Sequence, residues 1–80
     1  MITKSQLRDG FKFTYRSEIY KLTKAAPESE FYYVESVDSN DRREGYVGNV
    51  DSIDDESFTF YTFVMNHKIV VEINYSECYL

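Results

Sequence analysis

The sequence predicts an all-β domain (minor α): a small, strongly bent antiparallel barrel of five to six strands with a short N-terminal helical turn. Two observations predict it. Apolar and polar residues alternate at two-residue spacing along 11–16, the period of a strand with one buried face. Residues 58–75 then form two long apolar segments around a polar Asn66-His67 pair, as in a hairpin. In a chain of 80 residues, a strongly bent sheet leaves little open edge.

The N-terminal segment 2–10 predicts a short helical turn. Thr3 followed by Gln6 has the spacing of a capping box. Gly10 suits the left-handed conformation that ends a helix. A helix of this length is marginal by itself, so we expect it to rest on the core through Ile2 and Leu7.

Residues 11–24 predict the first hairpin. A turn at Ser17-Glu18 would place Tyr15 opposite Tyr20, although Ser-Glu is a weak choice for a two-residue turn and a longer loop is the alternative. The expected inner face is Phe11, Phe13, Tyr15, Tyr20 and Leu22. The expected outer face is Lys12, Thr14, Arg16, Ile19, Lys21 and Thr23.

The middle of the chain predicts a central strand and a return strand. Residues 31–37 begin with apolar residues on both faces, as in a strand with neighbours on each side. Residues 38–44 predict a polar turn. Residues 45–50 predict a short strand whose two glycines indicate a bulge or a sharp bend. Residues 51–57 predict a loop or a single helical turn, with Asp51 as its N-cap.

The last hairpin is apolar on both faces. A turn at Asn66-His67 would place Val64 opposite Ile69 and Phe58 opposite Tyr75, which makes the inner face. Residues 77–80 predict a last short strand. The outer face carries an apolar patch of Tyr61, Phe63, Met65 and Val70. Either the chain's own ends cover this patch as a second small core, or a partner does.

The stretch "LRDGFKFTYRSEIYKLTK" places a strand led by glycine and ending in an aromatic residue before a strand carrying Tyr-x-Leu. In this it resembles SH3-like small barrels, over about a quarter of the chain. The resemblance implies a fold class and no particular activity.

Length and composition predict a single domain over 1–80 in a reducing, cytoplasmic setting. Cys78 is the only cysteine, so an internal disulfide is excluded. The N-terminal residues have no apolar run typical of a signal peptide. No apolar run approaches the roughly 20 residues that a membrane helix needs, so we expect no membrane association.

Charge is unevenly distributed along the chain. Residues 1–27 carry six basic and two acidic side chains, whereas 28–56 carry ten acidic and two basic ones. Carboxylates in a compact β domain imitate a run of phosphates and attract a basic groove. Small acidic proteins of mobile elements that block nucleases have a similar composition; ordinary solvated loops are the alternative. The acids in question are Asp38, Asp41 and Glu44 from one turn and Asp51, Asp54, Asp55 and Glu56 from the next loop.

The favoured hypothesis is a non-enzymatic binding protein that occludes a basic, nucleic-acid-handling protein such as a nuclease, through the two acidic loops and the apolar patch. One alternative is a nucleic-acid-binding barrel that uses Lys12, Arg16 and Lys21 with nearby aromatic residues, although a net charge of −5 opposes it. A second is a structural subunit that forms a homodimer through the Tyr61/Phe63 face.

Catalysis, metal binding and a cofactor are not expected. A Cys78–His67 pair is the only candidate dyad, and one extended strand would hold the two roughly 33 Å apart. Residues 38–45 begin like a calcium loop but place Arg42 and Arg43 where a ligand and a glycine are needed.

Overall fold

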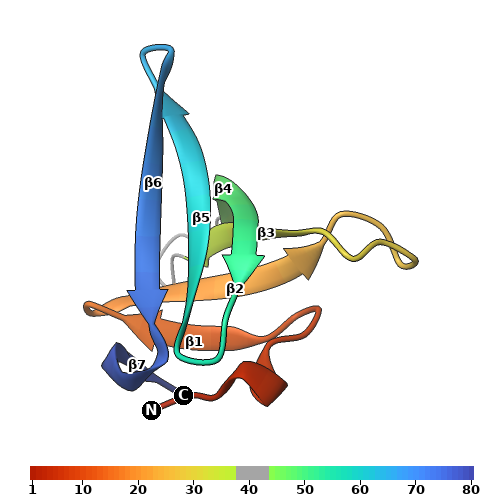
Figure 1. The fold of residues 1–80 in the computed structure, drawn as a ribbon, viewed down its shortest axis with the longest axis vertical. Coiled ribbons are helices and arrows are strands. Elements are labelled where there is room, and N and C mark those ends of the chain that lie inside the picture. Colours follow the sequence, from red (N-terminus) through yellow and green to blue (C-terminus); the bar gives the residue numbers. More distant parts are fainter. Residues whose placement is uncertain (38–43) are drawn as a thin grey trace.

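The computed structural model describes residues 1–37 and 44–80, which form a single seven-stranded antiparallel sheet curled into a half-barrel (Figure 1). The strand order is β6-β5-β4-β3-β2-β1-β7. The predicted all-β class is confirmed, with seven strands where five to six were predicted, and the helical elements among these residues are two short 3-10 turns. The strands are β1 (Lys12–Tyr15), β2 (Glu18–Lys24), β3 (Tyr32–Val37), β4 (Glu44–Ile53), β5 (Ser57–Val64), β6 (His67–Asn74) and β7 (Cys78–Tyr79).

The N-terminal turn, η1 (Lys4–Gln6), is 3-10 and begins as predicted. The Gln6 side chain accepts a hydrogen bond from the Thr3 N–H at 2.8 Å, which is one half of a capping box. Gly10 has φ +81°, the left-handed conformation expected of it. Ile2 is buried, and its N–H donates to the carbonyl of Tyr75 at 3.2 Å. The chain's beginning is thereby attached to its end.

The first hairpin turns one residue earlier than predicted. Arg16 and Ser17 have φ values of 49° and 67°, so they form the two-residue turn, and Tyr15 lies opposite Glu18. Two positive φ values match the twist of the strands, and this requirement decided the turn's position. The pairing moves by two residues, an even number, so each side chain keeps its face. The inner face is as predicted, with Phe11, Phe13, Tyr15 and Leu22 buried and Tyr20 half-buried.

The last hairpin shows the same correction. Its turn is Met65-Asn66, with φ values of 50° and 69°, and Val64 lies opposite His67. The predicted pairs are therefore wrong by two residues, and Phe58 lies opposite Ile73 instead of Tyr75. Tyr75 begins a second 3-10 turn, η2 (Tyr75–Glu77), from which the chain enters β7.

We expect the double substitution Met65→Asn, Asn66→Gly to raise the free energy of unfolding by about 1 kcal/mol. Met65 holds a left-handed conformation that a bulky side chain disfavours, whereas Asn-Gly is the preferred pair for this turn. Urea denaturation of the variant and wild type measures the difference. As a control, Asn-Gly placed at Lys12-Phe13, inside β1, is expected to lower the free energy of unfolding. An unchanged or lowered stability for the turn variant would contradict the strain argument.

The centre of the sheet is β3, as predicted from its two apolar faces, and Val34 is fully buried there. β4 is longer than predicted, because 51–53 continue the strand. The helical turn with Asp51 as N-cap is thus wrong: Ser52 and Ile53 pair with Thr59 and Phe58 instead. The bulge that the glycines of 45–50 indicated is confirmed by a register shift in the β3–β4 pairing. Of the predicted polar turn over 38–44, residues 38–43 lie outside the described residues, and Glu44 begins β4.

The half-barrel encloses a hydrophobic cluster of buried side chains, and both termini lie at the end of the molecule opposite the β5–β6 turn (Figure 1). Phe58 sits among three aromatic rings, those of Phe13, Phe60 and Tyr75, with centroids 5.9–6.5 Å away. The last strand forms as predicted and closes against β1, with Tyr15 opposite Cys78. We call this end of the molecule the base.

Candidate functional site

The outer half of the β5–β6 hairpin projects from the half-barrel. β5 pairs with β4 from Phe58 to Tyr61, and from Thr62 onward it pairs only with β6. Figure 1 shows the hairpin rising well beyond the remaining strands, at the end opposite the termini. We call residues 61–70 the arm. A two-stranded ribbon in water is marginally stable by itself, so the arm depends on its attachment to the sheet.

The arm exposes apolar side chains on both faces. On one face Phe63 is 62%, Met65 89% and Val70 56% exposed. On the other, Val64 is 50% and Ile69 43% exposed. The prediction that Val64 and Ile69 belong to the core is therefore wrong, because the β4–β5 pairing ends at Asn49 and Tyr61 and does not continue along this part of β5.

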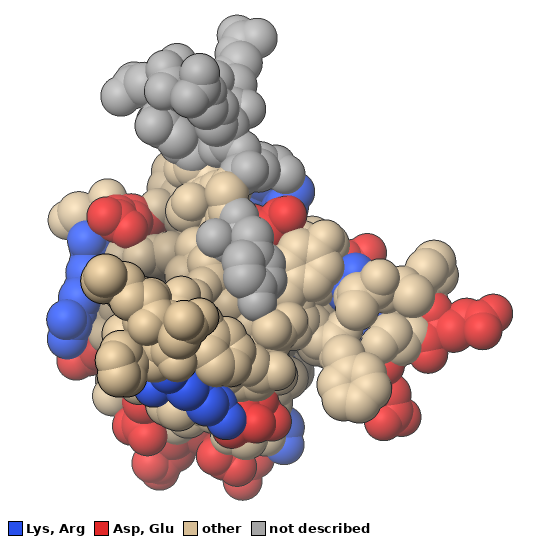
Figure 2. Space-filling view, turned by 90° about the horizontal axis from the view of Figure 1, so that it is seen from above, with Lys and Arg blue, Asp and Glu red and all other residues tan. Residues whose placement is uncertain are grey.

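The chain's own ends do not cover the arm. Both termini lie at the base, at the other end of the molecule (Figure 1). Tyr61 is half-buried and meets Phe63 edge to face at 6.0 Å, while the Lys68 ammonium lies 4.6 Å from the Tyr61 ring centre. Seen from above the tip, uncharged side chains gather at the near end of the molecule, with charges of both signs interspersed around them (Figure 2). An exposed apolar patch of this kind is typical of a docking surface.

The acidic residues of the β4–β5 turn lie apart from this patch. Asp54, Asp55 and Glu56 connect β4 to β5 at the base and are exposed. Since β5 runs from Ser57 to Val64, at about 3.3 Å per residue they lie about 25 Å from the arm's tip. Asp55 is 3.5 Å from Lys4 in an exposed ion pair. Asp54, Asp55 and Glu56 therefore belong to a different surface from the apolar patch.

The remaining acids lie elsewhere. Asp51 is exposed at the register shift of β4, between Val50 and Ser52. Glu44 begins β4. Asp38 and Asp41 lie outside the described residues. The clustering of the two acidic loops that the sequence suggested stays a prediction.

A shallow hollow of about 350 Å³ opens at the base, beside this acidic turn. Met1, Ile2, Asp55, Glu56 and Tyr75 contribute to its lining. The Tyr75 hydroxyl donates to the carbonyl of Asp54 at 2.6 Å, which holds the acidic turn against η2. Burial, followed by the nearby Asp54, Asp55 and Cys78, raises the pKa of Tyr75 to about 12. The Tyr75–Asp54 hydrogen bond thus holds one side of the hollow in place, and the sequence did not indicate this contact.

This raised pKa predicts a loss of stability at alkaline pH. A phenol that titrates near pH 10 in the unfolded chain and near 12 in the fold favours folding below pH 10, and this contribution disappears as the pH rises from 10 to 12. We expect Tyr75→Phe to be less stable by about 1 kcal/mol at pH 8, through the lost hydrogen bond. This difference in stability should shrink above pH 10 and change sign as the pH approaches 12, because only the wild type has a buried phenol to ionise. Urea denaturation across this range measures it, and a constant difference would contradict the assignment.

The two candidate catalytic residues are not brought together. His67 is exposed at the arm's tip, whereas Cys78 is buried at the base beyond the whole length of β6. Burial raises the pKa of the Cys78 thiol to about 11, so it is protonated at neutral pH. Within 1–37 and 44–80, no group of three or more His, Cys, Asp or Glu side chains is arranged to hold a metal ion.

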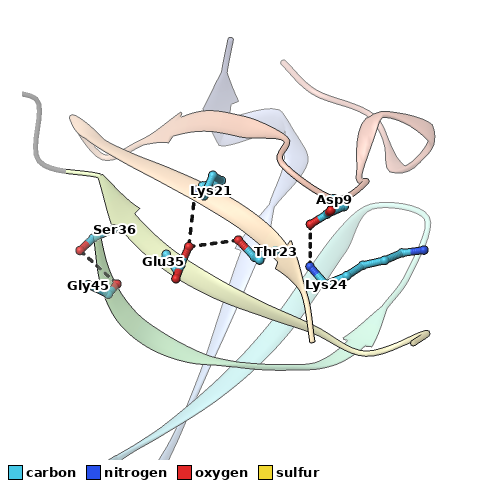
Figure 3. A network of polar contacts seen from close by, with 7 residues as sticks. All are labelled: Asp9, Lys21, Thr23, Lys24, Glu35, Ser36 and Gly45. Atoms are coloured by element: carbon cyan, nitrogen blue, oxygen red, sulfur yellow. Dashed lines mark hydrogen bonds and ion pairs between the residues drawn. The ribbon is translucent and has the colours of Figure 1, made fainter. Parts of the chain in front are cut away.

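The basic outer face of the first hairpin is partly neutralised. The Lys21 ammonium lies 3.7 Å from the carboxylate of Glu35 on β3, which also accepts a hydrogen bond from Thr23 at 3.0 Å (Figure 3). Lys21 and Glu35 are directly opposed in the ladder, so their pairing follows from the register. This leaves Lys12 and Arg16 as the exposed cations among the three that were predicted to bind nucleic acid.

Fold and site together define a small antiparallel half-barrel with a projecting apolar arm. No family model, no curated protein and no solved structure matches this chain. In the part of the chain that the structure describes, no helix is both long enough and apolar enough to span a membrane.

Proposed function

We propose that this chain is a non-enzymatic binding protein that docks on another protein through its arm and so occludes part of the partner's surface. The observation that supports this most directly is the exposure of Phe63, Met65 and Val70 on one face of the arm, with Val64 and Ile69 on the other. Aromatic residues and methionine are enriched at the centres of protein interfaces. Burying these five apolar side chains against a partner would remove their apolar surface from water, and this favours binding.

The partner's chemistry is a finer proposal that rests on charge. A net charge of −5 favours encounter with a basic surface, and a nucleic-acid-handling protein such as a nuclease has one. The acids of the β4–β5 turn lie at the base, so in this proposal they steer the encounter over a distance while the arm makes the contact. The SH3-like likeness of the first hairpin stays an expectation about fold class and adds nothing on the partner.

Chemical cross-linking of the tagged protein in an extract of its source cells tests the proposal. We expect the double substitution Phe63→Ser, Met65→Ser to remove the specific cross-linked partner. Phe31→Ser, which removes an exposed aromatic ring outside the arm, serves as the matched control and should retain it. The charge-reversed set of Asp54, Asp55 and Glu56 to Lys should slow capture without abolishing it.

Two results decide against the arm. Loss of the partner in the charge-reversed set with full retention in the Phe63/Met65 variant would assign binding to the acidic turn. Equal capture by all variants and the wild type would remove both surfaces from the proposal. Circular dichroism of each variant confirms that the fold is intact before the comparison is made.

A further inference from the structure

The arm has a free edge with a defined hydrogen-bonding pattern. Among the strands that the structure describes, β6 is the last at one side of the sheet and pairs only with β5. In an antiparallel ladder, the backbone N–H and C=O groups of alternate residues point toward the partner strand. Counted from the two-residue turn at Met65-Asn66, the residues of β6 whose groups point away from β5 are Lys68, Val70 and Glu72. These offer a template for a further strand.

The side chains along this edge complement themselves. Lys68 and Glu72 are exposed and lie two residues to either side of Val70. If a second β6 pairs antiparallel with Val70 opposite Val70, Lys68 of each copy lies opposite Glu72 of the other. A row of like charges on an edge strand would prevent pairing, whereas this arrangement forms two reciprocal opposite-charge pairs around an apolar centre.

The side chains on the other face of β6 also fit the register with Val70 opposite Val70. Ile69, 43% exposed, would lie beside Val71 of the second copy, and Val71 beside Ile69. Moving the register by two residues in one direction places Lys68 opposite Val70; moving it in the other places Glu72 opposite Val70. Both alternatives leave the charges unpaired and put a charge beside an apolar side chain. Only the register centred on Val70 satisfies both faces.

We propose that the arm's edge binds a second copy of this chain by antiparallel β6–β6 pairing centred on Val70. This inference rests on the proposed function, because it names an occupant for the edge of the same arm. The pairing joins two arms into one four-stranded sheet. The apolar row across one face of that sheet is Tyr61 and Val70 followed by Val70 and Tyr61 of the second copy. The docking face is thereby doubled.

Sedimentation equilibrium with charge-swapped variants tests the register. In 0.15 M salt and at concentrations up to several hundred micromolar, we expect the wild type to reach twice the chain mass of 9.5 kDa. Lys68→Glu and Glu72→Lys each place like charges opposite one another and should yield monomers. The double variant should dimerise again, and an equimolar mixture of the two single variants should form a heterodimer. Lys12→Glu, the same charge change outside the arm, should leave the dimer intact.

Recovery of the dimer in the double variant would show that the Lys68–Glu72 charge pair, and no other effect of the substitutions, controls dimerisation. Lys68→Glu also removes the ammonium from the Tyr61 ring, and the double variant does not restore that contact. A recovered dimer therefore reports the pairing of charges across the two copies. Val70→Pro gives a second test, because it deletes an outward N–H without removing a bond to β5, and it should also yield a monomer.

Three outcomes overturn the proposal: a wild type that stays monomeric throughout, a dimer that both single variants retain, or a double variant that remains monomeric. Each is distinguishable from failure of the proposed function. A monomer that still loses its cross-linked partner on Phe63→Ser, Met65→Ser keeps the docking arm and removes only the self-pairing.

Discussion

Replacing Phe58 by alanine is expected to lower the free energy of unfolding by about 3–5 kcal/mol. Phe58 is 0% exposed, and its ring meets Phe13 edge to face at 5.9 Å. It also contacts Phe60 and Tyr75, so its loss opens a cavity where the inner faces of several strands meet. Close-packed neighbours relax only partly into such a cavity. For a chain of this size the loss is a large share of the total stability.

The matched control lies on the same strand. Phe63→Ala removes the same side chain from β5, but Phe63 is 62% exposed on the arm. We expect a change within about 0.5 kcal/mol. Urea denaturation followed by circular dichroism measures both, with Phe58→Leu as a graded variant that stays folded. If Phe58→Ala and Phe63→Ala lower the free energy of unfolding by similar amounts, the arm packs against the body of the protein and does not project from it.

Gly48→Ala is expected to destabilise the fold by about 3 kcal/mol, through the backbone and not through a lost contact. A Cβ at Gly48 would collide with the carbonyl oxygen of Tyr61 and would lie 2.7 Å from Cδ2 of Phe60 and 3.0 Å from the carbonyl carbon of Tyr61. Backbone atoms cannot move aside as the end of a flexible side chain does. Gly48 thus allows β5 to cross closely at the point where the arm leaves β4.

Gly45→Ala provides the comparison, on the same strand and with the same added methyl group. Its Cβ would meet only the Ser36 hydroxyl, at 3.3 Å, and that side chain can rotate. We expect a change within about 0.5 kcal/mol. In Gly48→Ala, amide chemical shifts of Phe60 and Tyr61 should also move, because the strand must retreat. Equal stabilities for the two alanine variants would mean that β5 does not approach Gly48 so closely.

Two-residue periodicity was sufficient to predict the fold class and the inner faces. Alternation along 11–16 assigned Phe11, Phe13 and Tyr15 to the core, and all three are buried. The central place of 31–37 followed from its apolar residues on both faces, and β3 is central. These predictions survived a two-residue error in both hairpins, because an even shift of register preserves the face of every side chain.

The turns themselves were misplaced because their residues carry a weak signal. Arg16-Ser17 and Met65-Asn66 have positive φ at both positions without a glycine, so the usual Asn-Gly signature was missing. The strand at 51–53 was missed for a related reason. Asp51 resembles an N-cap by its residue type, and only pairing of its neighbours with β5 holds it in extended conformation.

The sequence by itself determined an all-β chain, the aromatic inner face of its first hairpin, and an apolar outer patch of Tyr61, Phe63, Met65 and Val70. Only the tertiary structure decided that Val64 and Ile69 are also exposed and that the acids of the β4–β5 turn lie at the opposite end of β5. The physical reason is that a residue's face is set by its own strand's period, whereas its burial depends on how far the neighbouring strand stays paired with it. β4 accompanies β5 only as far as Tyr61, and no local pattern in 58–75 encodes that limit.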